Sequence, residues 1–301
     1  MADKQSNKIT VPKIRARKGT GPKLAMVTAY DATMARLMEE AGVDLLLVGD
    51  SLGMVIQGLA NTLPVTLEEI CYHGRAVARA KRRAHLVGDM PFMSYQASVE
   101  QAVISAGRLL KEGAFESVKL EGGEDYAAHV RAIVRAGIPV MGHVGLTPQW
   151  VHAMGGFRVQ GKGEDAAARV VADARAIEQA GAYAITVEGV PADLGRRITD
   201  AVSIPTIGIG AGPDCDGQVL VCYDFLGMER NLRPKFVKRF AELGDEIVAA
   251  TRQYVEEVRD GTFPAPEHGF GMAAPKTIGE PTGGEPLAGS VPPSYGPASD
   301  E

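Results

Sequence analysis

The sequence predicts an α/β protein made of a single (β/α)₈ barrel of the TIM type. Short apolar runs rich in Val, Ile and Leu alternate with longer amphipathic segments along most of the 301 residues. A joint made of a helix end, a glycine and the next apolar run recurs at Gly42, Gly137 and Gly181, with a looser copy at Gly113. Repeated βα units indicate a parallel sheet. Eight such units favour a closed barrel over an open, doubly wound sheet.

The predicted strands lack strict alternation of polar and apolar residues. This pattern is typical of parallel strands that are buried on both faces. In chain order, the eight expected strands are Leu24–Thr28, Asp44–Val48, His85–Val87, Ser117–Leu120, Pro139–Gly142, Ala182–Val187, Pro205–Ile209 and Val219–Tyr223.

Apolar residues at helical spacing fill the segments between these strands. Thr66 is followed three residues later by Glu69, a capping-box pattern that marks the start of a helix. The glycines of the repeated joint suit the left-handed position just after a helix. The expected helices are Ala32–Ala41, Thr66–Lys81, Val99–Glu112, Glu124–Ala136 and Asp165–Ala180.

Composition suggests where the barrel ends. We assign residues 1–272 to the barrel and an N-terminal arm, whose basic stretch at 13–23 we expect to be solvated. Residues 273–301 are rich in Pro, Gly, Ser and acid. A segment of this kind cannot bury enough apolar surface to offset its ordering entropy, so we expect it to be disordered.

Composition also excludes several classes of protein. A net charge of -5 with mixed signs lacks the basic stripe of a nucleic-acid binder. Three cysteines without CxxC spacing argue against a disulfide framework and against a structural zinc site. No stretch resembles a signal peptide or a membrane span, so we expect a cytoplasmic protein that does not enter a membrane.

Ionisable residues follow five successive predicted strands. Asp50, Asp89, Glu121, His143 and Glu188 end the second to the sixth strand. Any one of them could be a turn or helix-cap residue. The carboxyl ends of the strands in a (β/α)₈ barrel face the reaction site, however, and a set of five favours a shared cavity there.

Three of these residues suit a divalent metal ion. Asp50, Asp89 and Glu121 offer hard oxygen ligands of the kind that Mg²⁺ prefers, and without a cation they would repel one another. Lys119 shares a strand face with Glu121, so it could form a structural ion pair or hold a substrate carboxylate. Ser51 offers a hydroxyl and a backbone N–H that could also bind a carboxylate.

Glu188 lies across the ring from Asp50, where a carboxylate free of metal could act as a base. Two glycine-rich segments are weaker candidates. The segment 156–162 fits the first seven positions of a P-loop, but Gly163 stands where Ser or Thr is required and no strand precedes it, so we interpret it as a mobile lid. The segment 208–212 lacks a complete dinucleotide fingerprint, and we interpret it as a loop whose backbone approaches a ligand.

The chain resembles the ketopantoate hydroxymethyltransferase family from about residue 8 to about residue 270. Matching segments include VGDS, VGDM, KLEGG, GHVGLTPQ and TVEGVP. The resemblance implies a barrel related to the phosphoenolpyruvate/pyruvate-binding enzymes. It also implies that the metal ligands are Asp50, Asp89 and, through water, Glu121, that the substrate-binding residues are Asp50, Ser51, Asp89, Lys119 and His143, and that the proton acceptor is Glu188.

The resemblance further implies a reaction and its partners. One Mg²⁺ per subunit would assist transfer of a hydroxymethyl group from 5,10-methylenetetrahydrofolate to 3-methyl-2-oxobutanoate, giving 2-dehydropantoate. Family members form homo-oligomers, commonly decamers. Three alternatives stay open: a related metal-dependent C–C lyase or mutase acting on phosphoenolpyruvate or oxaloacetate-like acids, an aldolase using Lys119 as a Schiff-base nucleophile, and a non-catalytic oligomeric scaffold.

Overall fold

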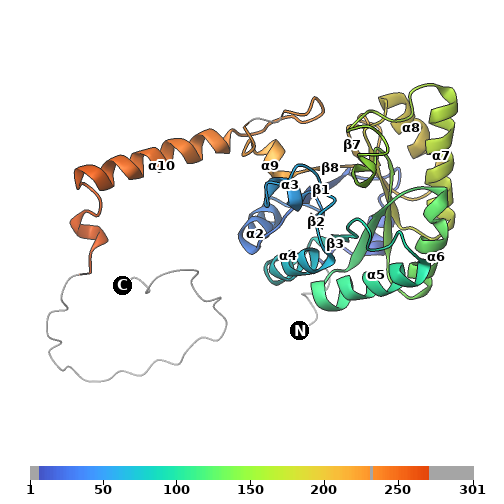
Figure 1. Cartoon of the computed structure of the whole chain (residues 1–301), viewed down its shortest axis with the longest axis horizontal. Helices are drawn as coiled ribbons and strands as arrows, with labels where there is room; N and C mark the ends of the chain where they lie inside the picture. Colours follow the sequence, from blue (N-terminus) through green and yellow to red (C-terminus); the bar gives the residue numbers. More distant parts are fainter. Residues whose placement is uncertain (1–6, 231–232, 271–301) are drawn as a thin grey trace, which may run out of the picture. The chain divides into compact units, whose positions relative to one another are not determined.

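The computed structural model describes residues 7–230 and 233–270. The chain divides into two compact units, residues 1–249 and 250–301. In the first unit eight parallel strands form a closed barrel, in which each strand pairs with the next and β8 pairs with β1 (Figure 1). The predicted (β/α)₈ barrel is therefore confirmed.

The strands lie close to their predicted positions. They are β1 Leu24–Thr28, β2 Leu45–Val48, β3 His85–Asp89, β4 Ser117–Glu121, β5 Val140–Gly145, β6 Ala184–Glu188, β7 Thr206–Ile209 and β8 Gly217–Leu220. The prediction for β8 is wrong by about two residues, because the apolar run 219–223 continues into a short helix, α9 Cys222–Phe225.

Helices follow the strands as the sequence pattern predicts. Besides α9, the α-helices are α1 Val11–Arg15, α2 Ala32–Glu40, α3 Leu52–Val55, α4 Leu67–Ala80, α5 Val99–Gly113, α6 Ala127–Arg135, α7 Glu164–Gln179, α8 Ala192–Ala201 and α10 Leu243–Asp260. Short 3₁₀ turns are η1 Glu124–Tyr126, η2 Pro148–Trp150 and η3 Pro266–His268.

Local signals explain several helix ends. The capping box at the start of α4 forms, since Thr66 N donates to Glu69 Oε2 at 2.7 Å and Glu69 N donates to Thr66 Oγ1 at 3.2 Å. The glycines of the repeated joint have positive φ angles, +90° at Gly42, for example. The fourth joint differs, because Ala114 takes the left-handed conformation and Gly113 is the last residue of α5.

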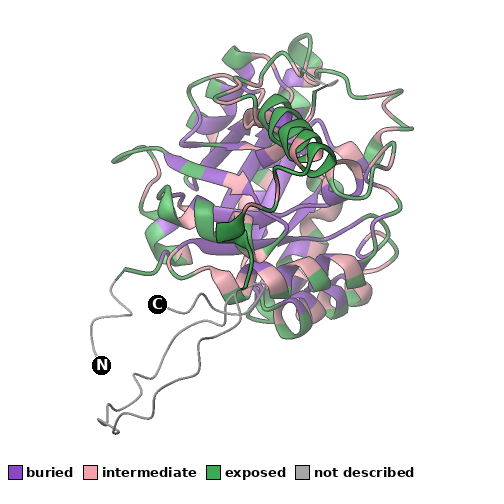
Figure 2. Ribbon diagram, turned by 90° about the vertical axis from the view of Figure 1, so that its left-hand side faces the viewer, coloured by how far each residue is buried: buried purple, intermediate pink, exposed green. Residues whose placement is uncertain are grey.

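Two apolar cores hold the barrel together, and Figure 2 shows how continuously the strands are buried. One core lies between the strands and the surrounding helices. The other includes inward-facing residues from the beginnings of strands, such as Leu24 and Leu45, together with Ile9 and Ile14 from the N-terminal segment. The interior of the barrel is thus a packed core, as in other barrels of this class.

The basic stretch 13–23 is mostly exposed, as predicted, but Ile14 and Lys18 attach it to the barrel. Ile14 of α1 is fully buried. Lys18 Nζ donates to Asp216 Oδ2 at 3.0 Å and to the Thr199 carbonyl at 2.6 Å. An apolar residue hidden within a basic stretch joins this segment to the barrel, and charge alone gave no sign of it.

The predicted disordered tail at 273–301 lies outside the described residues. The described part of the second unit contains the end of α10 and the turn η3. Within residues 7–230 and 233–270, no helix is both long and apolar enough to cross a membrane.

Candidate active site

The ionisable residues predicted at the strand ends lie together at one end of the barrel. Strand register places Asp89 beside Lys119 and Glu121 beside His143. Asp50 follows β2, and its backbone N–H donates to Asp89 Oδ2 at 3.3 Å. All five of these residues, Asp50, Asp89, Lys119, Glu121 and His143, are buried, although each side chain can carry charge. Burial of so many ionisable groups is costly, so their mutual contacts decide what the site can do.

Lys119 pairs with Asp89 and not with Glu121, the partner that the sequence suggested. Its Nζ lies 2.7 Å from Asp89 Oδ1, and the two side chains are 5% and 3% exposed. Burial opposes the charge on Lys119, but attraction to Asp89, Glu121 and Asp50 outweighs it and raises the pKa of the ammonium above its ordinary value. Lys119 is therefore protonated at neutral pH.

The three acids outnumber this one cation. Burial, and next the charge of Asp89, raise the pKa of Asp50 to about 7. Burial and the charge of Asp50 raise the pKa of Glu121 well above its ordinary value. Carboxylates in such a position either take up protons or attract another cation.

A divalent ion fits this donor set only with help from other ligands. Among the described residues, no three Asp, Glu, His or Cys side chains converge closely enough to hold an ion between them. One oxygen of Asp89 already accepts from Lys119, and one oxygen of Asp50 accepts from Gln149 Nε2 at 2.9 Å. Mg²⁺ usually takes one or two protein carboxylates and completes its shell with water and substrate oxygens. Asp50 and Asp89 suit that role, and Glu121 fits a water-mediated one.

His143 lies between two carboxylates. Its Nε2 is 3.2 Å from Glu188 Oε2, and its Nδ1 is 3.7 Å from Glu121 Oε1. Burial and the charge of Lys119 lower the pKa of His143, so the ring is neutral near pH 7. Within the described part of the chain, neither buried ring nitrogen makes a well-directed hydrogen bond. A substrate or water oxygen could satisfy them.

Glu188 is the most accessible acid of the group. Its side chain is 18% exposed, against 1% for Glu121. The end of β5 approaches it closely, because a Cβ at Gly145 would stand 2.3 Å from the Glu188 carbonyl oxygen. Gly145 also has a φ angle of +94°, which favours glycine. A partly exposed carboxylate beside a neutral imidazole is well placed to exchange protons with a bound molecule.

Ser51 lies beside the acids and is held by a residue that the sequence did not single out. Its Oγ is 2.8 Å from the hydroxyl of Tyr30, and burial raises the pKa of that tyrosine above its ordinary value. A Cβ at Gly49 would come 2.9 Å from Ser51 Oγ and 3.5 Å from Asp89 Oδ2. Tyr30 and Gly49 therefore shape the cavity, although an apolar tyrosine after β1 gives no distinct sequence signal.

Both glycine-rich segments lie next to Glu188, since Ile209 pairs with Glu188 in the sheet and Gln160 N donates to the Gly189 carbonyl at 2.8 Å. No strand leads into segment 156–162, which consists of turns and irregular backbone before α7. Segment 208–212 packs closely against α8, and its predicted approach to a ligand stays a prediction. A Cβ at Gly212 would stand 2.5 Å from that of Ala192 in α8.

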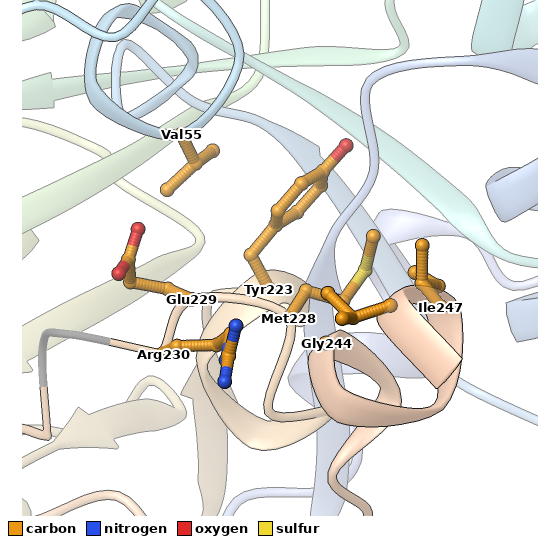
Figure 3. A pocket seen from close by; sticks show the side chains of 8 residues that line it. Val55, Tyr223, Met228, Glu229, Arg230, Gly244 and Ile247 are labelled. Atoms are coloured by element: carbon orange, nitrogen blue, oxygen red, sulfur yellow. The ribbon is translucent and has the colours of Figure 1, made fainter. Parts of the chain in front are cut away.

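A separate cavity of about 340 Å³ opens elsewhere on the first unit (Figure 3). None of the strand-end acids lines it, so we do not assign the chemistry to it. Its lining residues are Val55, Tyr223, Met228, Glu229, Arg230, Gly244, Ile247 and Val248.

The fold and the clustered acids define a (β/α)₈-barrel enzyme whose reaction centre lies at the carboxyl ends of the strands. The chain belongs to the ketopantoate hydroxymethyltransferase family, whose model matches residues 8–266. A 3-methyl-2-oxobutanoate hydroxymethyltransferase of Anaeromyxobacter sp. (strain Fw109-5) is 55% identical, with 92% of this chain and 95% of the relative covered.

Solved structures of other enzymes share the fold. A 2,3-dimethylmalate lyase of the PEP mutase/isocitrate lyase superfamily aligns with a TM-score of 0.56 at 18% identity, covering 85% of this chain and 92% of the lyase. Phosphonopyruvate hydrolase in complex with oxalate and Mg²⁺ aligns with the same TM-score at 15% identity, covering 86% and 92%. These likenesses confirm the expected relation to the phosphoenolpyruvate/pyruvate barrels at the level of fold.

Proposed function

We propose that this enzyme transfers a hydroxymethyl group from 5,10-methylenetetrahydrofolate to 3-methyl-2-oxobutanoate and so forms 2-dehydropantoate. Membership of the family supports the choice of reaction. The observation that carries the proposal is the buried group of Asp50, Asp89, Lys119, Glu121 and His143, with Glu188 at its edge. A centre rich in acids that also holds one fixed cation suits a substrate with a carboxylate and an adjacent ketone.

Lys119 and Ser51 would bind the substrate carboxylate. The ammonium of Lys119 is held by Asp89, so it enters the cavity as a fixed positive charge. A protonated amine is a poor nucleophile, which argues against a Schiff base on Lys119. The Ser51 hydroxyl is oriented by Tyr30 and can donate to a carboxylate oxygen.

Asp50 and Asp89 would hold Mg²⁺, with Glu121 acting through water. When bound, the ion would supply Lewis-acid stabilisation of the negative charge that develops on the ketone oxygen. Asp50 and Asp89 are buried and fixed by hydrogen bonds before any ligand arrives. Such pre-organisation avoids reorganisation during the reaction.

Glu188 would accept the proton from C3 of the substrate. Removal of that proton leaves an enolate, whose C3 forms the new bond to the one-carbon unit of the folate. One water is consumed overall, its oxygen becomes the new hydroxyl group, and tetrahydrofolate is released. His143 Nε2 lies 3.2 Å from Glu188 Oε2, so the imidazole is close enough to take part in the proton transfer. The homo-oligomer and the cytoplasmic location stay predictions that accompany this proposal.

A coupled assay tests the function directly. The full-length chain is given 3-methyl-2-oxobutanoate and 5,10-methylenetetrahydrofolate, and formation of 2-dehydropantoate is followed with and without a chelator. We expect product that disappears with chelator and returns with Mg²⁺. Turnover of phosphonopyruvate or of a C4 keto acid, with no 2-dehydropantoate formed, would favour the lyase or mutase instead. Full activity in chelator would refute the metal site.

A further inference from the structure

We propose that Gln149 is a positioning residue that sets the orientation of two metal-site carboxylates at once. This inference rests on the proposed function and extends it to a residue outside the predicted site. Gln149 lies in the turn η2 after β5 and is 3% exposed. It makes no contact that the sequence pattern would have suggested.

The first step of the argument is the contact with two acids. Gln149 Nε2 donates to Asp50 Oδ2 at 2.9 Å. The backbone N–H of the same residue donates to Glu121 Oε2 at 3.0 Å. One residue thus occupies one oxygen on each of two carboxylates that come from different strands. A cation or a water at either acid would therefore bind chiefly through the oxygen that Gln149 does not occupy.

The second step is that the amide can adopt only one orientation. Its Oε1 accepts from the Tyr95 hydroxyl at 3.0 Å and from Gln96 Nε2 at 2.9 Å. Its Nε2 also donates to the Met90 carbonyl at 2.9 Å. Turning the amide over would place donors against donors and acceptors against acceptors. The side chain is therefore fixed with its NH₂ group toward Asp50.

The third step concerns what a fixed amide contributes. Partners that hydrogen-bond to metal ligands set the direction in which those ligands present their oxygens, and losing them typically costs about 10–100-fold in metal affinity. The Tyr95 hydroxyl also accepts from the Glu121 backbone N–H at 3.2 Å and lies 2.9 Å from the Glu121 carbonyl oxygen, so the same network holds the end of β4. Gln149 thus links the loop between β3 and α5, which holds Met90, Tyr95 and Gln96, to the geometry of the acids.

Binding of Mn²⁺ to the full-length enzyme, measured by calorimetry in the presence of oxalate, tests the inference without any turnover. Gln149→Met keeps the length of the side chain and removes the amide. We expect the dissociation constant for Mn²⁺ to rise about tenfold. Gln101→Met is the matched control, because Gln101 donates to the Met93 carbonyl at 2.8 Å on the same rim without touching an acid. The Mn²⁺ affinity of the Gln101→Met enzyme should stay within about twofold of that of the wild type.

Unchanged Mn²⁺ affinity in a folded Gln149→Met enzyme would overturn the inference, and so would an equal loss in Gln101→Met. If Gln149→Met does not fold, Gln96→Met replaces it, because that change removes a donor to Gln149 Oε1 and leaves the Tyr95 hydroxyl and its contacts with the Glu121 backbone in place. We then expect the dissociation constant for Mn²⁺ to rise about threefold, and an unchanged dissociation constant would overturn the inference. A wild-type enzyme that fails to bind Mn²⁺ would overturn the proposed metal site as well, which separates the two failures.

Discussion

Replacing His85 by glutamine should flatten the fall in stability that the enzyme shows in weak acid. His85 begins β3, at the opposite end of that strand from Asp89, and is 3% exposed. Its Nε2 lies 2.9 Å from Ser117 Oγ, which is itself 2.9 Å from the Tyr183 hydroxyl. The neighbouring charges are Glu116, 3.7 Å from Nδ1, and the lysines that pair with that glutamate.

The magnitude follows from the pKa. Burial lowers the pKa of His85 from 6.5 to about 4, although Glu116 partly opposes this effect. The unfolded chain binds a proton with the ordinary pKa, so between these two values it binds more protons than the folded one. Stability therefore falls as the pH drops below 6.5 and stops falling, for this group, below about 4. The full effect is roughly 3 kcal/mol, of which roughly 2 kcal/mol is lost by pH 5.

Urea unfolding at a fixed protein concentration, from pH 8 to pH 5, would measure this effect. Glutamine keeps a group that can hydrogen-bond to Ser117 and never takes up a proton. The stability difference between wild type and variant should narrow or reverse by about 2 kcal/mol over that range. Parallel curves for the two proteins would show that His85 is not the group responsible and would refute the argument from burial.

Three other changes should have distinct outcomes. Glu188→Gln should stop exchange of the substrate C3 proton with deuterated water, followed by NMR, and should slow turnover by about 10²–10⁴-fold; continued exchange would remove Glu188 as the base. Asp89→Ala should weaken Mg²⁺-dependent binding of the 2-oxo acid in calorimetry by at least about tenfold, and equal affinity with and without metal in the wild type would contradict this expectation. Asp216→Asn should lower the free energy of unfolding by about 2 kcal/mol, because Asp216 accepts from Lys18 Nζ, Gly19 N and Thr206 N. A change below about 0.5 kcal/mol would show that this ion pair contributes little.

Much of the fold was predictable because, in a closed parallel barrel, the order of the apolar runs along the chain is the order of the strands around the barrel. The apolar runs alternate with helical segments, which favours strands, and closure of the barrel brings their carboxyl ends to one rim, so Asp50, Asp89 and Glu121 could be placed together from the sequence. The limits of β8 were misjudged because a short apolar run is equally compatible with a helix, and the last two residues of the run 219–223 belong to α9.

The residues that the sequence did not reveal are those whose role depends on distant neighbours. Gln149 contacts an acid 99 positions away, and its immediate sequence context, Thr-Pro-Gln, is that of an ordinary turn. Lys119 could be assigned to the correct face by strand alternation, but its choice of Asp89 over Glu121 depends on the spacing between β3 and β4. Periodicity fixes which way a side chain points, while its partner depends on packing across strands.

Ile9 and Ile14 pack with the inward-facing residues at the beginnings of the strands, so apolar side chains fill the barrel at the end opposite the acids. A substrate would therefore reach the acids from the side of the barrel on which the carboxyl ends of the strands lie. If the proposed reaction holds, the small keto acid binds first and the bulkier folate binds over it. The folate product is then released before the keto acid product. Steady-state kinetics should then show a compulsory order of addition, in which excess folate slows the dissociation of the keto acid.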